Sequence, residues 1–241
     1  MVEGLRGASG RVRWMFTDRS GGVSTGAHAS LNLADRVDDD PGAVSDNRAR
    51  VAVSMGVAPD RLVVMEACHG IVVSVVESGV DPLVSGVDAL VTRESGRALA
   101  ALAADCLPIV LHDSGSGIVG VVHSGWVGVR DDVVGAALDA MAVLGAVSVS
   151  AVIGPAVCGR CYAVPIERVA EVADRFPEAA SVTLDGRAAL NLPAAVAARL
   201  VRAGVEVADV GVCTVESSVH FSYRRDHVTG RQAAIVVLEA P

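Results

Sequence analysis

Short apolar runs between polar breaks are the feature that most constrains this chain. Three of them, Leu99–Ala103, Ile109–Leu111 and Gly117–Val122, follow one another closely, and the last two are rich in Val and Ile. Glycine, proline and serine bound these runs, and each is short for a buried helix. We therefore predict successive buried strands, with functional side chains held rigidly where the strands break.

Outside this stretch, the predicted strands and helices do not strictly alternate. Further strand-like runs are Arg11–Thr17, Leu62–Glu66, Ile71–Glu77, Val87–Thr92, Val149–Ile153, Val205–Val215 and Ala233–Leu238. Helical spacing of apolar residues, with capping residues at the ends, predicts helices over residues 41–55, 129–144, 166–175 and 192–203. The segment His220–Asp226 is predicted to be a polar loop. We find no repeat and no linker, so we predict an α/β fold of the α+β type. Residues 1–241 would form a single domain of mixed layered β-sheets flanked by helices.

The composition argues against several functional classes. The chain has 241 residues, a net charge of −8 and no lysine, so every basic side chain is an arginine. An acidic chain is a poor match for nucleic acid, and the lack of lysine removes P-loop and Schiff-base chemistry. No apolar run reaches the roughly 18 residues of a membrane span, and we see no secretory signal. Five cysteines, an odd number, fit a reducing cytoplasm better than a disulfide framework, so we expect a cytoplasmic protein. We expect no nucleic-acid or membrane partner.

Two histidines and one cysteine lie where predicted strands break. His69 separates a pair of strand-like runs, Cys106 follows the first central strand, and His123 ends the third. Imidazole nitrogen and thiolate sulfur are zinc ligands, and three protein ligands leave a fourth position for water or substrate. Spacing alone leaves a second interpretation open, a buried structural cysteine with two ordinary histidines.

A C-x-x-C motif, Cys158–Cys161, follows a Gly-Pro turn. In a cytosolic chain such a motif can be a redox pair or half of a zinc site. The chain has no second C-x-x-C, and we interpret this one as a tightly packed turn.

A series of short motifs together resembles one bacterial family. In chain order they are Arg19-x-Gly21-Gly22-Val23-Ser24, Leu31-Asn32-Leu33, Asn47-Arg48, Cys68-His69-Gly70, Ala104-Asp105-Cys106-Leu107-Pro108, His123-Ser124-Gly125-Trp126, Ile153-Gly154-Pro155, Cys161-Tyr162 and Phe221-Ser222-Tyr223-Arg224-Arg225. The set resembles the multicopper polyphenol oxidase (laccase-like) family, now largely described as purine nucleoside phosphorylases, some of whose members are called peptidoglycan editing factors. The resemblance covers nearly the whole chain.

The resemblance implies a zinc ion held by His69, Cys106 and His123. It also implies phosphorolysis of adenosine, inosine and methylthioadenosine, together with deamination of adenosine. The small-molecule partners would then be a purine nucleoside and phosphate. Copper could take the place of zinc, because copper(II) lies above zinc in the divalent affinity order. We expect a monomer or a small homo-oligomer.

We predict that the three metal ligands and Arg48 carry catalysis. Without lysine, arginines must hold the phosphate, with Arg48 and Arg225 foremost. The predicted substrate-binding residues are Arg19, Gly21, Gly22, Asn32, Asn47, Arg225 and Arg231. Arg48 lies on an otherwise apolar helix face. It either reaches into the site or pairs with a structural carboxylate, for which Asp88 and Asp105 are candidates.

Three positions depart from the family pattern. Ala67 stands where a glutamine usually precedes the first ligand, Val127 where an arginine usually follows the tryptophan, and Ala163 where a glutamate usually follows the Cys-Tyr pair. Losing an arginine and a glutamate near the site would weaken substrate or phosphate binding.

Other functions compete with the phosphorolytic one. A copper-dependent polyphenol oxidase needs a mononuclear copper and a trinuclear cluster, which use many imidazoles, and this chain has six histidines. A metal-free cysteine hydrolase that edits peptidoglycan precursors would use Cys106 as nucleophile and His123 or His69 as base. A metal-binding partner protein without catalysis is the non-enzymatic alternative.

Overall fold

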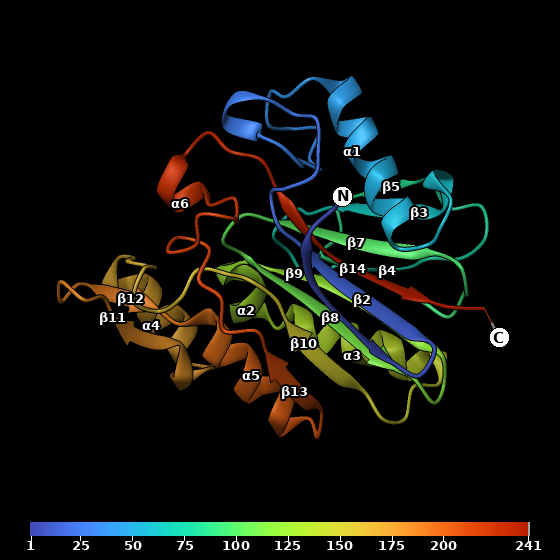
Figure 1. Cartoon of the computed structure of the whole chain (residues 1–241). Helices are drawn as coiled ribbons and strands as arrows, with labels where there is room; N and C mark the ends of the chain where they lie inside the picture. The colour runs from blue at the N-terminus through green and yellow to red at the C-terminus, as the bar shows by residue number, and fades with distance from the viewer. Residues whose placement is uncertain (241) are drawn as a thin grey trace.

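Two six-stranded mixed β-sheets face each other in the computed structural model, which describes residues 1–240 (Figure 1). The first sheet has the order β1 (Gly4–Ser9), β2 (Val12–Thr17), β14 (Gln232–Leu238), β7 (Ala98–Ala103), β3 (Leu62–Glu66) and β5 (Leu83–Ser85). The second has the order β13 (Glu206–Asp209), β10 (Ser150–Ile153), β8 (Leu107–Asp113), β9 (Ile118–Ser124), β6 (Ala89–Thr92) and β4 (Val73–Val75). A separate hairpin joins β11 (Ala180–Val182) to β12 (Ala188–Leu190).

The central strands are apolar throughout because both of their faces are buried. In β7, Leu99 and Ala101 pack between the two sheets, while Ala98 and Ala100 belong to the core on the outer side of the first sheet. Successive side chains of a strand point to opposite faces, so a strand buried on both sides needs a continuous apolar run. The run of residues 99–103 has this pattern for this reason.

Helices cover the outer faces of the two sheets. The α-helices are α1 (Pro41–Ser54), α2 (Trp126–Asp131), α3 (Val133–Leu144), α4 (Ile166–Ala173), α5 (Leu192–Arg202) and α6 (Tyr223–Asp226), of which α1, α3 and α5 cover sheet faces. The buried stripe of α1 joins the core outside the first sheet, while α3 and α5 pack outside the second (Figure 1). The predicted mixed, layered sheets with flanking helices are confirmed. None of the helices in residues 1–240 has the length and apolar character needed to cross a membrane.

The helix predicted over residues 129–144 is wrong in one respect, because it is two helices. Asp132 adopts a left-handed conformation, with φ of 70°, and ends α2. Its carboxylate then accepts a hydrogen bond from the backbone N–H of Gly135 and caps α3. Arg175 and Arg199 also contact this carboxylate, so tertiary ion pairs stabilise a break that the apolar periodicity does not reveal.

Strand lengths also differ from the prediction. Only Val73–Val75 of the run 71–77 and only Glu206–Asp209 of the run 205–215 form strands, because each pairs along its length with one parallel neighbour, β6 or β10. The predicted polar loop at 220–226 contains the short helix α6. The strands β1, β5, β11 and β12 were not predicted.

Candidate metal centre

His69, Cys106 and His123 come together where the chain passes from one sheet to the other. Strands β3 and β7 are parallel neighbours in the first sheet, so the segments after them, which carry His69 and Cys106, leave the same sheet edge. Cys106 lies in the connection from β7 to β8. His123 is in β9, opposite Pro108 of β8, which brings the end of β9 beside that connection.

The three side chains have the spacing of a metal ligand set. Their candidate ligand atoms all lie within 4.8 Å of one another, and Cys106 Sγ is 3.9 Å from His69 Nε2. The two imidazole rings meet edge to face, with centroids 4.8 Å apart. The ligand atoms of a tetrahedral zinc with bond lengths of ~2.0–2.3 Å are separated by distances close to these. The donor set of two imidazoles and one thiolate therefore fits zinc, and copper as well.

Asp88, a buried residue just before β6, holds two of these ligands in place. Its carboxylate lies 2.9 Å from His123 Nδ1, which leaves Nε2 free to face the cluster. The same carboxylate accepts hydrogen bonds from the backbone N–H groups of His69 and Gly70, at 3.0 and 2.6 Å. Burial raises the pKa of Asp88, but its hydrogen bonds with His123 and Cys68 outweigh this effect and lower it to about 2. A carboxylate behind a ligating histidine fixes its ring and tautomer.

The cysteine and the buried histidine stabilise each other's charged forms. Burial raises the pKa of Cys106, but the charge of His123 and hydrogen bonds from both histidines bring it down to about 6. Burial lowers the pKa of His123, while the Cys106 thiolate and Asp88 raise it to about 9. A thiolate at neutral pH is the form that binds a metal or acts as a nucleophile. Metal binding would displace the proton from His123.

The backbone around the ligands adopts conformations that are unusual for its residues. His69 and Asp105 have φ of 62° and 90°, in the left-handed region that non-glycine residues rarely adopt. Side chains added at Gly125 would begin 3.1 Å from His69 Cδ2 and 3.2 Å from Cys106 Sγ. The glycine of the His-Ser-Gly-Trp motif therefore keeps room for the cluster. Strained residues that the surrounding structure holds in place are characteristic of functional sites.

Asp105 ties the cysteine-bearing connection to the C-terminal part of the chain. Its two carboxylate oxygens accept hydrogen bonds from the Thr214 hydroxyl and from the backbone N–H of Arg224, both at 2.6 Å. The position next to Cys106 is thus anchored by residues more than a hundred positions away. Asp88 and Asp105 were the two candidate carboxylates for the alternative in which Arg48 forms a structural ion pair, and neither is its partner, because both are engaged elsewhere and Arg48 pairs with Asp35.

A cavity of about 450 Å³ opens beside the cluster. All three predicted ligands line it, together with Arg48 of α1 and Arg231. Its other lining residues are Ala34, Asp35, Arg36, Val37, Met65, Glu66, Ala67, Leu83, Leu102, Ala103, Ala104 and Tyr223. A volume of this size matches small-molecule pockets, and the mixture of apolar walls with a few charged groups is typical of them.

Arg48 and Arg231 approach the cavity from different segments. Arg48 forms an ion pair with Asp35 at 2.8 Å and donates a hydrogen bond to the carbonyl of Leu33 at 2.9 Å. Arg231 donates to the carbonyls of Thr229 and Gly230, and burial lowers the pKa of its guanidinium. Both guanidinium groups are therefore positioned by backbone carbonyls and sit on the wall of one cavity.

The structure places the other predicted substrate-binding residues outside the cavity wall. Arg225 donates to the carbonyls of Thr214, Ser217 and His220 and pairs with Asp226, so its donors are committed to the local backbone. Arg19 donates to the carbonyl of Ala29 and lies over the ring of Phe221. These contacts explain both arginines as parts of the scaffold, which removes Arg225 from the foremost place that we gave it.

The remaining predicted residues also have structural contacts. Buried Asn47 donates to Ser24 and to two backbone carbonyls, and Asn32 accepts from the backbone N–H of Arg231 at 2.9 Å. A side chain at Gly22 would begin 2.1 Å from the carbonyl oxygen of Ser30, so the chain passes too closely there for any other residue. Gly21 has a φ of 89°, which favours glycine. None of these four lines the cavity within residues 1–240.

Sequence reasoning missed several cavity residues. Arg36 and Glu66 form an ion pair on the cavity wall, and Asp35 holds Arg48. The run of charges after Leu33 was the available signal, but it has no helical or strand period that could be interpreted. Of the three departures from the family pattern, only Ala67 lines the cavity.

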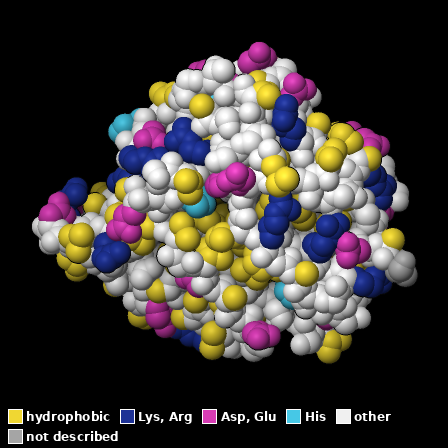
Figure 2. All heavy atoms as spheres, in the orientation of Figure 1, with side chains coloured by type: hydrophobic (Ala, Val, Ile, Leu, Met, Phe, Trp, Pro, Cys, Tyr) yellow, Lys and Arg dark blue, Asp and Glu magenta, His cyan; other side chains and the backbone are white. Residues whose placement is uncertain are grey.

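Charged side chains of both signs are interspersed on the face drawn in Figure 2, and no continuous basic area covers it. The histidines do not form a copper cluster in residues 1–240. Only two groups of close histidine, cysteine and acidic side chains occur there, and neither has more than two histidines. The ligands of a trinuclear copper site are therefore not gathered in this part of the chain, whereas a single-ion site is.

Comparison with known proteins shows the family of the chain. The family described as multi-copper polyphenol oxidoreductase laccase matches residues 13–239. The chain belongs to this family. A family member from Streptomyces coelicolor, named a purine nucleoside phosphorylase, is 49% identical over 98% of this chain and 99% of its own. Another of that name, from Corynebacterium glutamicum, is 40% identical over 94% of each chain. The crystal structure of YlmD from Geobacillus stearothermophilus, which is 29% identical, superposes with a TM-score of 0.88 and covers 100% of both chains.

Proposed function

We propose that this chain is a zinc-dependent purine nucleoside phosphorylase that acts on adenosine, inosine and methylthioadenosine and also deaminates adenosine. The observation that carries the proposal is a single cavity whose wall contains both the His69, Cys106 and His123 cluster and two positioned arginines. The names of the family members from Streptomyces coelicolor and Corynebacterium glutamicum support the same activity. We expect the protein to act in the cytoplasm, as a monomer or a small homo-oligomer.

The residues of the cavity have separable roles in this reaction. In phosphorolysis a phosphate oxygen attacks C1′ of the ribose, the C1′–N9 bond breaks, and the bonding electron pair leaves with the purine. His69, Cys106 and His123 would hold the zinc, and Asp88 keeps the His123 ring in the orientation that presents Nε2. When bound, zinc supplies a Lewis acid that stabilises negative charge as it develops.

Arg48 and Arg231 are the groups that we assign to phosphate. Both are cations on the cavity wall, and a planar guanidinium can bind two phosphate oxygens at once. Asp35 stays close enough to Arg48 to fix its direction. The partly buried side chain of Leu102 lines the same cavity and offers an apolar surface for the flat purine. The cavity thereby has separate places for the anion and for the base.

Product analysis tests this function directly. Zinc-loaded protein is incubated with inosine in the presence and absence of inorganic phosphate, and hypoxanthine and ribose 1-phosphate are measured. We expect both products in equal amounts and only when phosphate is present. Hypoxanthine release that does not depend on phosphate would identify a hydrolase instead, and no release from any of the three nucleosides would overturn the proposal. Ammonia release from adenosine tests the deaminase part.

A cysteine hydrolase is the second candidate, because the same side chains also form a nucleophile, base and acid series. Cys106 is a thiolate beside His123, and His123 is oriented by Asp88. This order of groups activates a cysteine without a metal. Protein stripped of metal distinguishes the two functions. A phosphorylase loses turnover with the metal and regains it with zinc, whereas a cysteine hydrolase acting on peptidoglycan precursors keeps its turnover.

A further inference from the structure

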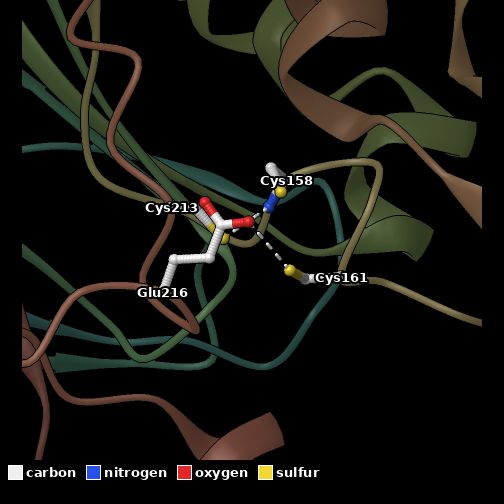
Figure 3. Close-up of side chains that lie close together, drawn as sticks. All are labelled: Cys158, Cys161, Cys213 and Glu216. Atoms are coloured by element: carbon white, nitrogen blue, oxygen red, sulfur yellow. Dashed lines mark hydrogen bonds between the residues drawn. The ribbon is translucent and has the colours of Figure 1, made fainter. Parts of the chain in front are cut away.

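A second group of metal-binding side chains lies apart from the cavity. It consists of Cys158, Cys161, Cys213 and Glu216, whose candidate ligand atoms all lie within 4.8 Å of one another. Figure 3 shows the three thiols and the carboxylate converging from two loops. None of the four lines the cavity described above. We call this group the thiol cluster.

Parallel pairing of two strands brings the two halves of the thiol cluster together. Strands β10 and β13 are parallel neighbours, with Ile153 opposite Asp209, so the loops that follow them leave the same edge of the sheet. The pairing continues beyond the strands as a bridge between Ala156 and Cys213. The loop after β10 carries Cys158 and Cys161, and the loop after β13 carries Cys213 and Glu216.

The spacing within each loop is the same. Cys158 and Cys161 are three positions apart, and so are Cys213 and Glu216. In both loops a turn closes the pair, through backbone hydrogen bonds from Cys161 to Cys158 at 3.0 Å and from Ser217 to Cys213 at 3.0 Å. Zinc sites are commonly built from two such short-spaced pairs. The C-x-x-C half-site that has no sequence partner therefore finds its partner in a C-x-x-E.

The turn between Cys158 and Cys161 has no room for a side chain at Gly159. A side chain at Gly159 would begin 2.7 Å from Ser181 Oγ and 2.8 Å from Asn191 Cβ, so the turn packs directly against the β11–β12 hairpin and the start of α5. The backbone N–H of Cys158 points at Cys213 Sγ, 3.4 Å away, and Cys161 Sγ lies 3.6 Å from Glu216 Oε1 (Figure 3). The thiols are thus held near one another before any ion arrives.

We propose that Cys158, Cys161, Cys213 and Glu216 bind a structural zinc ion. Sulfur ligands of a tetrahedral zinc, each at ~2.3 Å, stand ~3.8 Å apart, which is compatible with candidate ligand atoms that all lie within 4.8 Å of one another. Arg160 lies 3.4 Å from Glu216 and offsets part of the negative charge that three thiolates and a carboxylate would gather. An opening of about 340 Å³, lined by Cys158 and Cys213 among others, gives an ion access to the cluster.

The ion would join two loops that also support the cavity. Thr214, which follows Cys213, donates its hydroxyl hydrogen bond to Asp105, next to Cys106. Tyr162, which follows Cys161, lies under the guanidinium of Arg224 at 4.9 Å. The thiol cluster touches neither substrate nor the reacting atoms in this arrangement, so its effect on the cavity is one of positioning.

Cobalt loading tests the thiol cluster separately from the first centre. Cobalt(II) replaces zinc in thiolate sites, and its near-ultraviolet charge-transfer band grows with the number of bound thiolates. We expect about two ions in the wild-type chain and about one each in Cys106→Ser and Cys161→Ser. The ion that remains in Cys106→Ser should have the stronger thiolate band, because it has three sulfur ligands rather than one.

Matched double variants complete the test. In the Cys106→Ser background, Cys68→Ser removes a thiol outside the cluster and should leave the cobalt band unchanged, while Cys213→Ser should abolish it. Cys161→Ser, at a partly exposed position, serves in its place where the buried Cys213 is needed for folding. The absence of any bound ion in Cys106→Ser would overturn the proposal. So would a mass two units lower than that of the reduced chain, which would identify a disulfide within the cluster.

Discussion

The two metal-ligand groups of this chain are built in different ways. The centre at His69, Cys106 and His123 offers three ligands, lies where the chain passes from one sheet to the other and faces a cavity of about 450 Å³. The thiol cluster offers four ligands from two loops at one edge of the second sheet. Catalytic zinc sites keep a position open for substrate or water, whereas structural sites fill all four positions with protein ligands. The number of ligands and the presence of a cavity are therefore the grounds on which we propose a catalytic role for the first group and a structural role for the second.

The contacts that hold the ligands in place also differ between the two groups. A buried carboxylate, Asp88, orients the first centre through three hydrogen-bonded groups, and His69 is held in a left-handed conformation. The thiol cluster has ordinary turns and a partly exposed carboxylate in Glu216. Strained backbone conformations at the first centre lower the stability of the fold, whereas the ordinary turns of the thiol cluster do not. The following experiments separate the two groups in decreasing order of expected effect.

Removing one cysteine from each group should give the largest contrast. Cys106→Ala removes a ligand that every enzymatic interpretation needs, and the loss of Lewis-acid stabilisation worth several kcal/mol corresponds to a decrease of roughly 1,000-fold in kcat/KM for inosine phosphorolysis. Cys158→Ala should lower kcat/KM by less than about tenfold and mainly lower Tm. Similar losses of kcat/KM in the two variants would mean that the division into catalytic and structural groups is wrong.

Arg48→Ala tests whether the cavity beside the first centre binds phosphate. A charge-assisted bond to phosphate contributes on the order of 1.5–3 kcal/mol, so kcat/KM for phosphate should fall roughly tenfold to a hundredfold. Arg48→Lys should restore little, because an ammonium group lacks the planar fork. Arg50→Ala is the matched control, since Arg50 is exposed on the same helix and outside the cavity wall.

The measurement that decides the role of Arg48 is phosphorolysis set against Tm. A large decrease in Tm with nearly normal phosphorolysis would assign Arg48 to the scaffold through its ion pair with Asp35. The phosphate site would then have to be rebuilt around Arg231.

Asp88→Asn should weaken only the first centre. Replacing the partner of a ligating histidine typically lowers metal affinity by about 10- to 100-fold. Zinc titration against a chelator should therefore show one site weakened and the other unchanged. Weakening of both sites to the same extent would indicate a general loss of structure, which Tm measured on the same sample would reveal.

Alkylation of the metal-free protein should give the smallest effect and the sharpest pH signature. The pKa of Cys106 is lowered to about 6, while burial and its sulfur neighbours raise the pKa of Cys161. The reaction of Cys106 with iodoacetamide should therefore level off above about pH 7, and that of Cys161 should keep rising to high pH. Near pH 7 Cys106 should react at least roughly a few-fold faster than Cys161, because its larger thiolate fraction outweighs the weaker nucleophilicity of a thiolate of low pKa.

Cys68 is the control for exposure in this experiment. It is exposed, but its pKa is raised because it donates a hydrogen bond to Asp88. Peptide mass spectrometry should find it less modified than Cys106 near pH 7. Zinc should protect Cys106, and failure of zinc to do so would contradict the first centre.

The sequence was informative where a site is built from strand ends. The breaks at His69, Cys106 and His123 are visible because buried strands have recognisable apolar runs, and the structure brings these three together. The role of Asp88 could not be predicted, although the residue lies within the predicted strand Val87–Thr92. Its partners are His123 of β9 and the backbone of residues 69–70 in the segment after β3, and no local pattern identifies such contacts.

Long-range strand pairing explains the other omissions. Cys213 and Glu216 meet the C-x-x-C motif only because β10 and β13 are parallel neighbours, and parallel register leaves no local signature. Glycines and asparagines of the family-like motifs, at 21, 22, 32 and 47, are predicted substrate contacts, and the structure shows tight backbone passages and buried hydrogen bonds there. A single sequence does not distinguish residues that contact a substrate from residues that are required by the backbone or by buried hydrogen bonds.

The position of the last strand has a consequence for synthesis on the ribosome. Strand β14, at Gln232–Leu238, pairs with β2 on one side and β7 on the other, so the first sheet stays split until these residues have been translated. The ligands at 69, 106 and 123 emerge long before that strand exists. The nascent chain must therefore pass through a stage in which these ligands have been made while the sheet that aligns two of them is open. A metal ion at the first centre would therefore gain its full ligand geometry only once β14 has been made.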